Sequence, residues 1–166
     1  MDPQCMPLYT IAELNSRLFT NCFDGMNHML TTGRISDDTS SFLFVASHLV
    51  DARAYLVTLA GGDASHPLVE QLRSVESIDA LAVPPGINDL PSAWQDLSST
   101  LLRQLPMLVQ PDLRRESPDP MPIVDQSVLG AIAFMLQHES YHLGQLAMLK
   151  KHLTGKAMKY SSKGRA

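Results

Sequence analysis

Helical periodicity in four segments, with no strand-like alternation between them, is the feature that most constrains the fold of this chain. The segments span roughly residues 7–29, 41–59, 91–105 and 125–153. In each of them apolar side chains recur every three or four residues, as expected for a helix with one buried face. We therefore predict an all-α protein, a four-helix bundle with two connections long enough to be crossovers.

Short local signals support these boundaries. The polar cluster "SDDTSS" supplies N-cap residues for the second segment, and "AGGD" ends it with glycines. Pro91 suits a first helical turn. The connection 60–90 has room for a short helix in its middle and a loop at its end, whereas "QPDLRRESPDPMP" cannot be helical throughout.

Composition favours one soluble domain spanning residues 1–166. Apolar residues make up 45% of the chain and charged residues 18%. We expect no membrane partner, since no apolar run approaches the roughly 18 residues that a spanning helix needs and no signal peptide is evident. Two cysteines in a chain of this size suggest reduced thiols in a cytoplasmic protein.

The charge is uneven along the chain. The net charge is −4, yet residues 150–166 carry six cations and no acid, including a basic tail over about 154–166. Such a tail can bind nucleic acid, but cations also favour the C-terminal end of a helix. We expect the second role and no nucleic-acid partner, because nucleic-acid binders usually carry basic charge over a whole face.

The string "HESYH", residues 138–142, places two histidines one turn apart. Together with Gln145 they interrupt a row that is otherwise apolar and faces inward, where polar atoms need partners. Imidazoles at positions i and i+4 stack on one helix face, so their nitrogens can converge on one metal ion. The row comprises Val128, Ala131, Met135, His138, His142, Gln145 and Leu149.

Two familiar metal sites do not fit. H-E-x-x-H is a zinc-protease pattern, but Gln145 and Met148 stand where its three-histidine form needs glycine and histidine, and no acid follows His142. Di-iron bundles need two Glu-x-x-His motifs, and this chain has only one.

His48 is the best candidate for a third ligand. It lies in "SFLFVASHLVDARAYLVTL", on a predicted buried stripe that comprises Phe44, Val45, His48, Ala52, Tyr55 and Leu59. His28 at a helix end, His66 in a Gly/Pro loop and His152 nearly three turns beyond His142 are poorer choices. Three histidines from two helices would leave an open coordination position, as in catalytic metal sites.

These residues resemble the DinB/YfiT-like superfamily of small four-helix proteins. The resemblance rests on "HLVDARAYL" in the second helical segment and "HESYHLGQL" in the last. A tryptophan often found before the first of these histidines is missing, with Phe42 and Phe44 nearby instead. The resemblance implies up-down-down-up topology, a divalent metal on His48, His138 and His142, and a homodimer. It also implies that some relatives are metal-dependent thiol transferases or isomerases.

We therefore expect a mononuclear metalloenzyme, with Zn, Ni, Fe or Mn not distinguished. Its small-molecule chemistry would be thiol S-transfer, isomerisation or hydrolysis, with a low-molecular-weight thiol as a possible cofactor. Asp51 and Gln145 are candidates to hydrogen-bond a ligand histidine; Glu139 could do the same, although we expect it on the surface. The alternative is a non-catalytic metal- or ligand-binding module, such as a stress-response interaction protein.

Overall fold

The chain forms an all-α fold in a computed structural model that describes residues 1–75, 81 and 83–161. Over these residues there is no β-strand, and the single extended pairing is an isolated antiparallel bridge between Glu116 and Ser127. The predicted all-α class is thereby confirmed.

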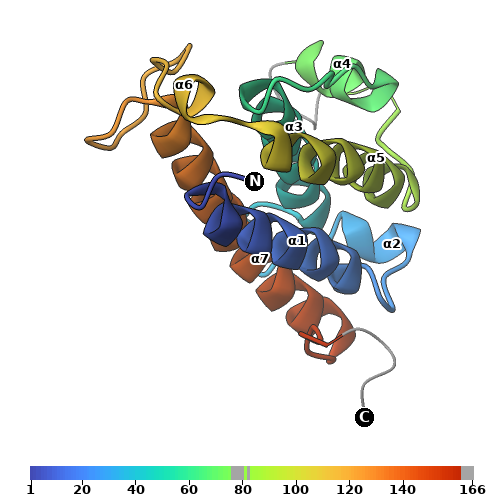
Figure 1. The fold of residues 1–166 in the computed structure, drawn as a ribbon. Helices are drawn as coiled ribbons and strands as arrows, with labels where there is room; N and C mark the ends of the chain where they lie inside the picture. The colour runs from blue at the N-terminus through green and yellow to red at the C-terminus, as the bar shows by residue number, and fades with distance from the viewer. Residues whose placement is uncertain (76–80, 82, 162–166) are drawn as a thin grey trace.

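Four helices of sixteen residues or more dominate the described part of the chain. Helix α7 packs against α1 and α3, and α5 packs against the same two helices (Figure 1). Helix α6 and the segment that follows it lie near the start of α7, whereas the described chain ends, at Ser161, beyond the other end of that helix. In chain order the elements are α1 (Cys5–Cys22), α2 (His28–Thr31), α3 (Phe42–Leu59), α4 (Pro67–Arg73), α5 (Asp89–Gln104), the 3₁₀ turn η2 (Leu105–Met107), α6 (Gln110–Leu113) and α7 (Val128–Thr154).

The two helices that carry the candidate ligands begin with serine caps. Ser41 Oγ accepts a hydrogen bond from the backbone N–H of Phe44, and Ser127 Oγ accepts one from Gly130. Each cap satisfies an N–H that the first turn leaves without a partner. At its C-terminal end α7 stops at Gly155, whose φ of 71° is the left-handed conformation that glycine adopts most easily. The predicted bounds of both segments hold to within about three residues.

The first helix is shorter than predicted. The apolar periodicity of residues 7–29 continues past the point where α1 ends at Cys22. Gly25 has a φ of 81°, which breaks the helix. Asn27 then caps the separate helix α2 by accepting a hydrogen bond from the N–H of Leu30. Spacing alone could not reveal this break, because the apolar pattern spans both helices.

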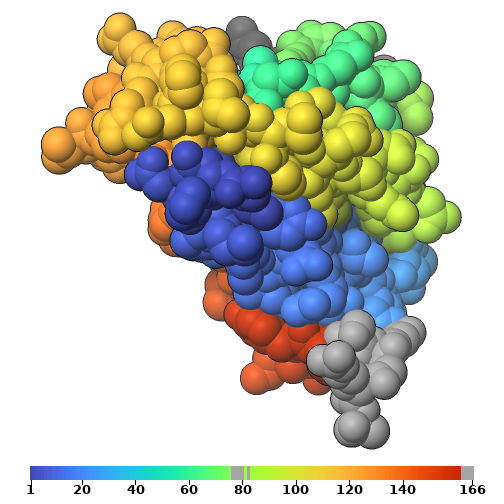
Figure 2. All heavy atoms as spheres, viewed as in Figure 1, coloured from blue at the N-terminus to red at the C-terminus, as the bar shows by residue number. Residues whose placement is uncertain are grey.

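The connections contain short helices. The predicted short helix in the connection 60–90 is α4, while residues 76–80 and 82 of the predicted loop lie outside the described residues. The proline-containing segment before α7 holds only the one-turn α6, as expected. Figure 2 shows α1 and α5 side by side on one face, with the segment before α7 projecting beyond them. Residues 162–166 of the predicted basic tail also lie outside the description.

Helix α3 runs through the core. Thirteen of its 18 residues are buried, including charged Arg53. By length and composition it is the one described helix that could cross a membrane, but 72% of that stretch is buried inside the fold. Core helices of globular proteins pass the same test, so this is weak support for a membrane span.

The two cysteines provide a test of the packing. Cys5 and Cys22 are free and fully buried, and burial raises the pKa of the Cys22 thiol to about 12. We expect Cys22 in a Cys5→Ala variant to react with an aromatic disulfide reagent at pH 8 about a thousandfold more slowly in the folded than in the unfolded protein, because little thiolate forms. Absorbance of the released thiolate, with and without denaturant, gives both rates. A fast reaction of the native thiol would contradict the buried position.

Candidate metal centre

Three histidines from two helices meet at one place. His48 comes from α3, and His138 and His142 come from successive turns of α7. All three are half-buried, so the cluster lies at the edge of the core and not at its centre. The predicted inward row on α7 is otherwise correct, since Val128, Ala131, Met135 and Leu149 are buried. On α3 the predicted stripe is less buried at its start, where Phe44 is exposed.

The ring nitrogens of the cluster face one another. One ligand atom from each histidine can be chosen so that all three lie within 4.8 Å of one another. The Nε2 atoms of His48 and His138 are 2.9 Å apart. The His142 ring centroid lies 4.6 Å from that of His48 and 4.4 Å from that of His138, with the planes nearly perpendicular. The three imidazole rings therefore meet edge to face and do not stack on one another.

This arrangement fits a single divalent cation. Two nitrogens bound to one tetrahedral zinc at about 2.0–2.1 Å lie about 3.3–3.4 Å from each other. The separations here, from 2.9 Å to at most 4.8 Å, span that value. Without a metal, a hydrogen bond can join His48 to His138, and Gln145 contacts Nδ1 of His142. Those contacts do not explain why the His142 ring converges on the other two. The donor set is all imidazole, which suits Zn, Ni, Cu or Fe.

The environment favours neutral imidazoles. Burial first, and then the neighbouring His142 and His48, together lower the pKa of His138 to about 4. Burial and His142 also lower the pKa of His48, while Asp51 acts in the opposite direction. A neutral ring keeps a lone pair on one nitrogen, which is the form that binds metals.

Gln145 sets the orientation of His142. Its Oε1 lies 2.7 Å from His142 Nδ1, and its Nε2 donates to the hydroxyl of Tyr141 at 3.2 Å. An amide oxygen can only accept, so His142 Nδ1 carries the hydrogen and its Nε2 keeps the lone pair. The expectation that Gln145 bonds a ligand histidine agrees with this contact.

We expect Gln145→Ala to weaken divalent-metal binding by about 10–100-fold, because partners of this kind hold a ligand ring and its tautomer. The affinity would be measured by isothermal titration with Zn²⁺ or Ni²⁺. The matched control is Gln137→Ala, which removes an exposed amide two turns earlier on the same helix. Equal affinity in the two variants would show that the Gln145 contact has no role in binding.

The prediction that Glu139 lies on the surface is wrong. Its side chain is fully buried, and its Oε2 forms an ion pair with Arg53 Nη2 at 2.8 Å. Although Glu139 follows His138 directly, it points about 100° around the helix, and that direction leads into the core. The glutamate of "HESYH" therefore forms a buried ion pair with Arg53.

Asp51 is engaged elsewhere. Its Oδ1 lies 2.5 Å from Arg73 Nε on α4, in a partly exposed ion pair. Its influence on the cluster is the electrostatic effect on His48 described above, and the described contacts include no hydrogen bond from Asp51 to that ring. Asp51 therefore affects His48 through its negative charge and does not orient the His48 ring.

The remaining histidines stay away from the cluster, as predicted. His28 and His152 are exposed. His66 caps α4, where its Nδ1 accepts a hydrogen bond from the backbone N–H of Leu68, and its Nε2 lies 3.8 Å from Asp96.

A surface cavity of about 270 Å³ adjoins the cluster through Gln145. Its other walls come from the segment before α3 and from α3 and α7 themselves, and include Ile35, Asp38, Val45 and Met148. Exposed Tyr141 lies on the same helix, with its ring centroid 5.0 Å from that of His142. A small molecule thus has space beside the side chain that orients His142.

Three buried residues grouped around Glu139 escaped the sequence reasoning: Asn15 and Arg53, which contact Glu139, and Trp94, which packs against Arg53. One signal could have identified Arg53, because it is the only basic residue other than histidine in the apolar run 42–59. A charge at such a position needs a buried partner. Nothing in the spacing along the chain identifies which residue that partner is.

Comparison with protein-family models and with curated proteins finds no match to this chain.

Proposed function

We propose that this protein is a mononuclear metalloenzyme that holds one divalent cation on His48, His138 and His142. The observation that carries the proposal is the convergence of three half-buried imidazoles, with atoms within 4.8 Å of one another, from two packed helices. The resemblance to DinB/YfiT-like proteins points the same way. It further suggests that α1, α3, α5 and α7 run up-down-down-up and that the protein forms a homodimer in the cytoplasm.

The proposed chemistry is activation of a small nucleophile, namely a low-molecular-weight thiol. A cation with three protein ligands and an open position lowers the pKa of a bound thiol or water toward 7. The three imidazoles are neutral ligands, so they leave the positive charge uncompensated and favour an anion such as a thiolate. The two acidic residues within three positions of a ligand in the sequence are already paired, Asp51 with Arg73 and Glu139 with Arg53.

Peptide hydrolysis is disfavoured by the same contacts. In H-E-x-x-H proteases the glutamate acts as general base on a water molecule. Here Glu139 is fully buried and hydrogen-bonded to Arg53 and Asn15. A carboxylate held in this way cannot reach a water molecule at the open side of the cluster without breaking a buried ion pair.

Metal binding is the first test. The purified, chelator-treated protein would be titrated with Zn²⁺, Ni²⁺ or Mn²⁺ and the stoichiometry determined by calorimetry and elemental analysis. We expect one ion per chain. Failure to bind any of these ions would refute the proposal.

Activity is the second test. The metal-loaded protein would be offered low-molecular-weight thiols with an alkylating electrophile in one series, and activated esters and amides in another. A rate with thiols above that of the His48→Ala variant supports thiol transfer, whereas a rate only with esters or amides indicates a hydrolase. Metal binding without any rate above that variant would favour the non-catalytic binding module.

A further inference from the structure

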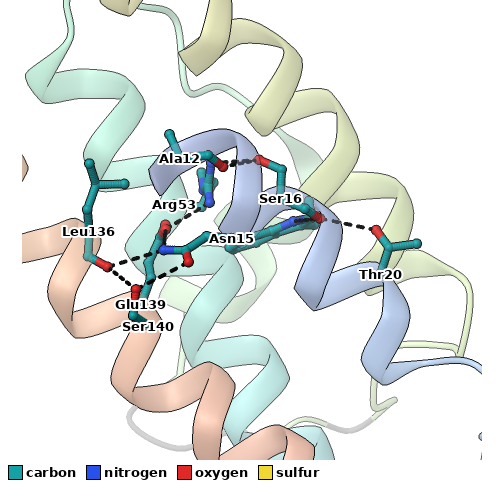
Figure 3. A network of polar contacts seen from close by, with 9 residues as sticks. Ala12, Asn15, Ser16, Thr20, Arg53, Leu136, Glu139 and Ser140 are labelled. Carbon is teal, nitrogen blue, oxygen red and sulfur yellow. Dashed lines mark hydrogen bonds and ion pairs between the residues drawn. The ribbon is translucent and has the colours of Figure 1, made fainter. Parts of the chain in front are cut away.

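A buried polar network connects all four long helices beside the histidine cluster. Arg53 of α3 donates to Glu139 of α7 at 2.8 Å and to Ser16 Oγ of α1 at 3.2 Å. Its guanidinium carbon lies 4.1 Å above the ring centroid of Trp94 on α5, whose indole N–H donates to the Ser16 carbonyl. Figure 3 shows Ser16 of α1, Arg53 of α3 and Glu139 of α7 gathered at one place between the helices.

Asn15 extends the network along α7. Its Nδ2 lies 3.3 Å from Glu139 Oε2 and 3.2 Å from the carbonyl of Leu136, and its Oδ1 accepts from Ser140. The amide therefore contacts three α7 positions within one turn around Glu139. Helix α1 is held against α7 at the residue that follows a candidate ligand.

The network lies next to the ligands in sequence on both helices. Glu139 directly follows His138 and precedes His142 by less than one turn. Arg53 is five residues after His48, which corresponds to about 7.5 Å along α3. A slide or rotation of α3 against α7 would separate Arg53 from Glu139, and it would also move His48 away from the other two histidines.

Global stability alone does not account for this pair. Buried ion pairs are often no more stabilising than apolar residues of the same size, because both charges lose their hydration. Here the pairing is also incomplete, since Arg53 Nε and Glu139 Oε1 are both buried without a hydrogen-bond partner among the described residues. Separating the two charges would nonetheless leave each of them buried and unpaired, which is costly. The pair therefore permits only those positions of α3 against α7 that keep Arg53 and Glu139 in contact.

We propose that the Arg53–Glu139 pair is a positioning device that sets the register of α3 against α7 and so preorganises the three histidines. This inference rests on the proposed metal site. Arg53 and Glu139 act through the ligands and do not touch the ion. Catalytic and metal constellations need this support, because a ligand misplaced by about 0.5 Å or more lowers affinity.

The test uses Co²⁺, whose visible absorption reports coordination geometry. The double variant Arg53→Met/Glu139→Met replaces both charges with apolar chains and leaves neither charge unpaired. We expect its Co²⁺ affinity to fall by about 10–100-fold with an altered spectrum. Glu139→Gln should bind within about threefold of wild type, since its amide oxygen can still accept from Arg53.

The matched control is Lys150→Met. Lys150 is also a buried cation on α7, and its Nζ donates to the carbonyl of Asp24 beyond the end of α1. It lies about three turns from His138. We expect unchanged Co²⁺ affinity and spectrum. All titrations are made far below the unfolding midpoint, where a loss of stability alone does not alter the affinity of the folded state.

The outcomes separate the two proposals. If the wild type binds no Co²⁺, the metal site itself is wrong. If the wild type binds and the double variant shows the same affinity and spectrum, the positioning role is wrong. Should the double variant not fold, Glu139→Asp takes its place, because the shorter side chain can keep the pair only if the helices shift. Binding by Glu139→Asp indistinguishable from wild type would equally overturn the inference.

Discussion

Replacing Glu139 with alanine will lower the free energy of unfolding by about 3–5 kcal/mol. The variant leaves the Arg53 guanidinium fully buried without its carboxylate. Removal of one partner is far more costly than loss of the attraction itself, since the remaining charge has neither water nor a counter-ion. Burial already disfavours both charges, raising the pKa of Glu139 and lowering that of Arg53, and each charge opposes the shift of the other.

Urea unfolding followed by circular dichroism measures this effect as a drop in midpoint at a constant m-value. Exposed Glu13 on α1 supplies the control, and Glu13→Ala should change stability by less than about 0.5 kcal/mol. The double variant Arg53→Met/Glu139→Met should recover much of the loss, because it buries no unpaired charge. A loss below about 1 kcal/mol for Glu139→Ala would contradict the buried pair.

Replacing His48 with alanine will weaken divalent-metal binding by about a hundredfold or more, because the loss of a ligand exceeds the 10–100-fold cost of losing a partner of a ligand. In the wild type, metal at about one hundred times its dissociation constant should stabilise the fold by about 2.7 kcal/mol. For a domain of this size that corresponds to a rise in melting temperature of about 5–11 °C. At the same metal concentration His48→Ala should show almost no rise.

Thermal melting with and without metal, together with calorimetric titration, checks this expectation. His152→Ala is the matched control, since His152 is an exposed histidine on the same helix as His138 and His142. It should keep the full rise in melting temperature. Equal metal stabilisation in the His48 variant would mean that α3 supplies no ligand.

The candidate ligands could be identified from sequence because the relevant pattern is local. His138 and His142 are one turn apart on a helix, so their common face follows from helical geometry alone. His48 was found by the same reasoning, as a polar residue on an otherwise apolar stripe. The structure brings all three together, although at the edge of the core, where Phe44 is already exposed.

Glu139 shows where this reasoning stops. Because Glu139 directly follows His138, helical geometry places it about 100° around the helix from that histidine. Whether that side of the helix faces water depends on which elements pack against it. In the folded chain α3 covers α7 near His138, and α1 covers the side of Glu139 with Asn15. A helix covered on two sides has more than one buried face. The prediction assumed a single buried face on α7 and therefore placed Glu139 on the surface.

The sequence by itself determined the all-α class, the long helices to within a few residues at most ends, and the histidines that can meet. These follow from periodicity, caps and glycines, which act over a few neighbouring residues. Only the tertiary structure decided that Arg53 pairs with Glu139, that Asp51 forms an ion pair with Arg73, and that α1 ends before Gly25. Partners of buried charges lie on other helices, and spacing along the chain carries no record of which helices become neighbours.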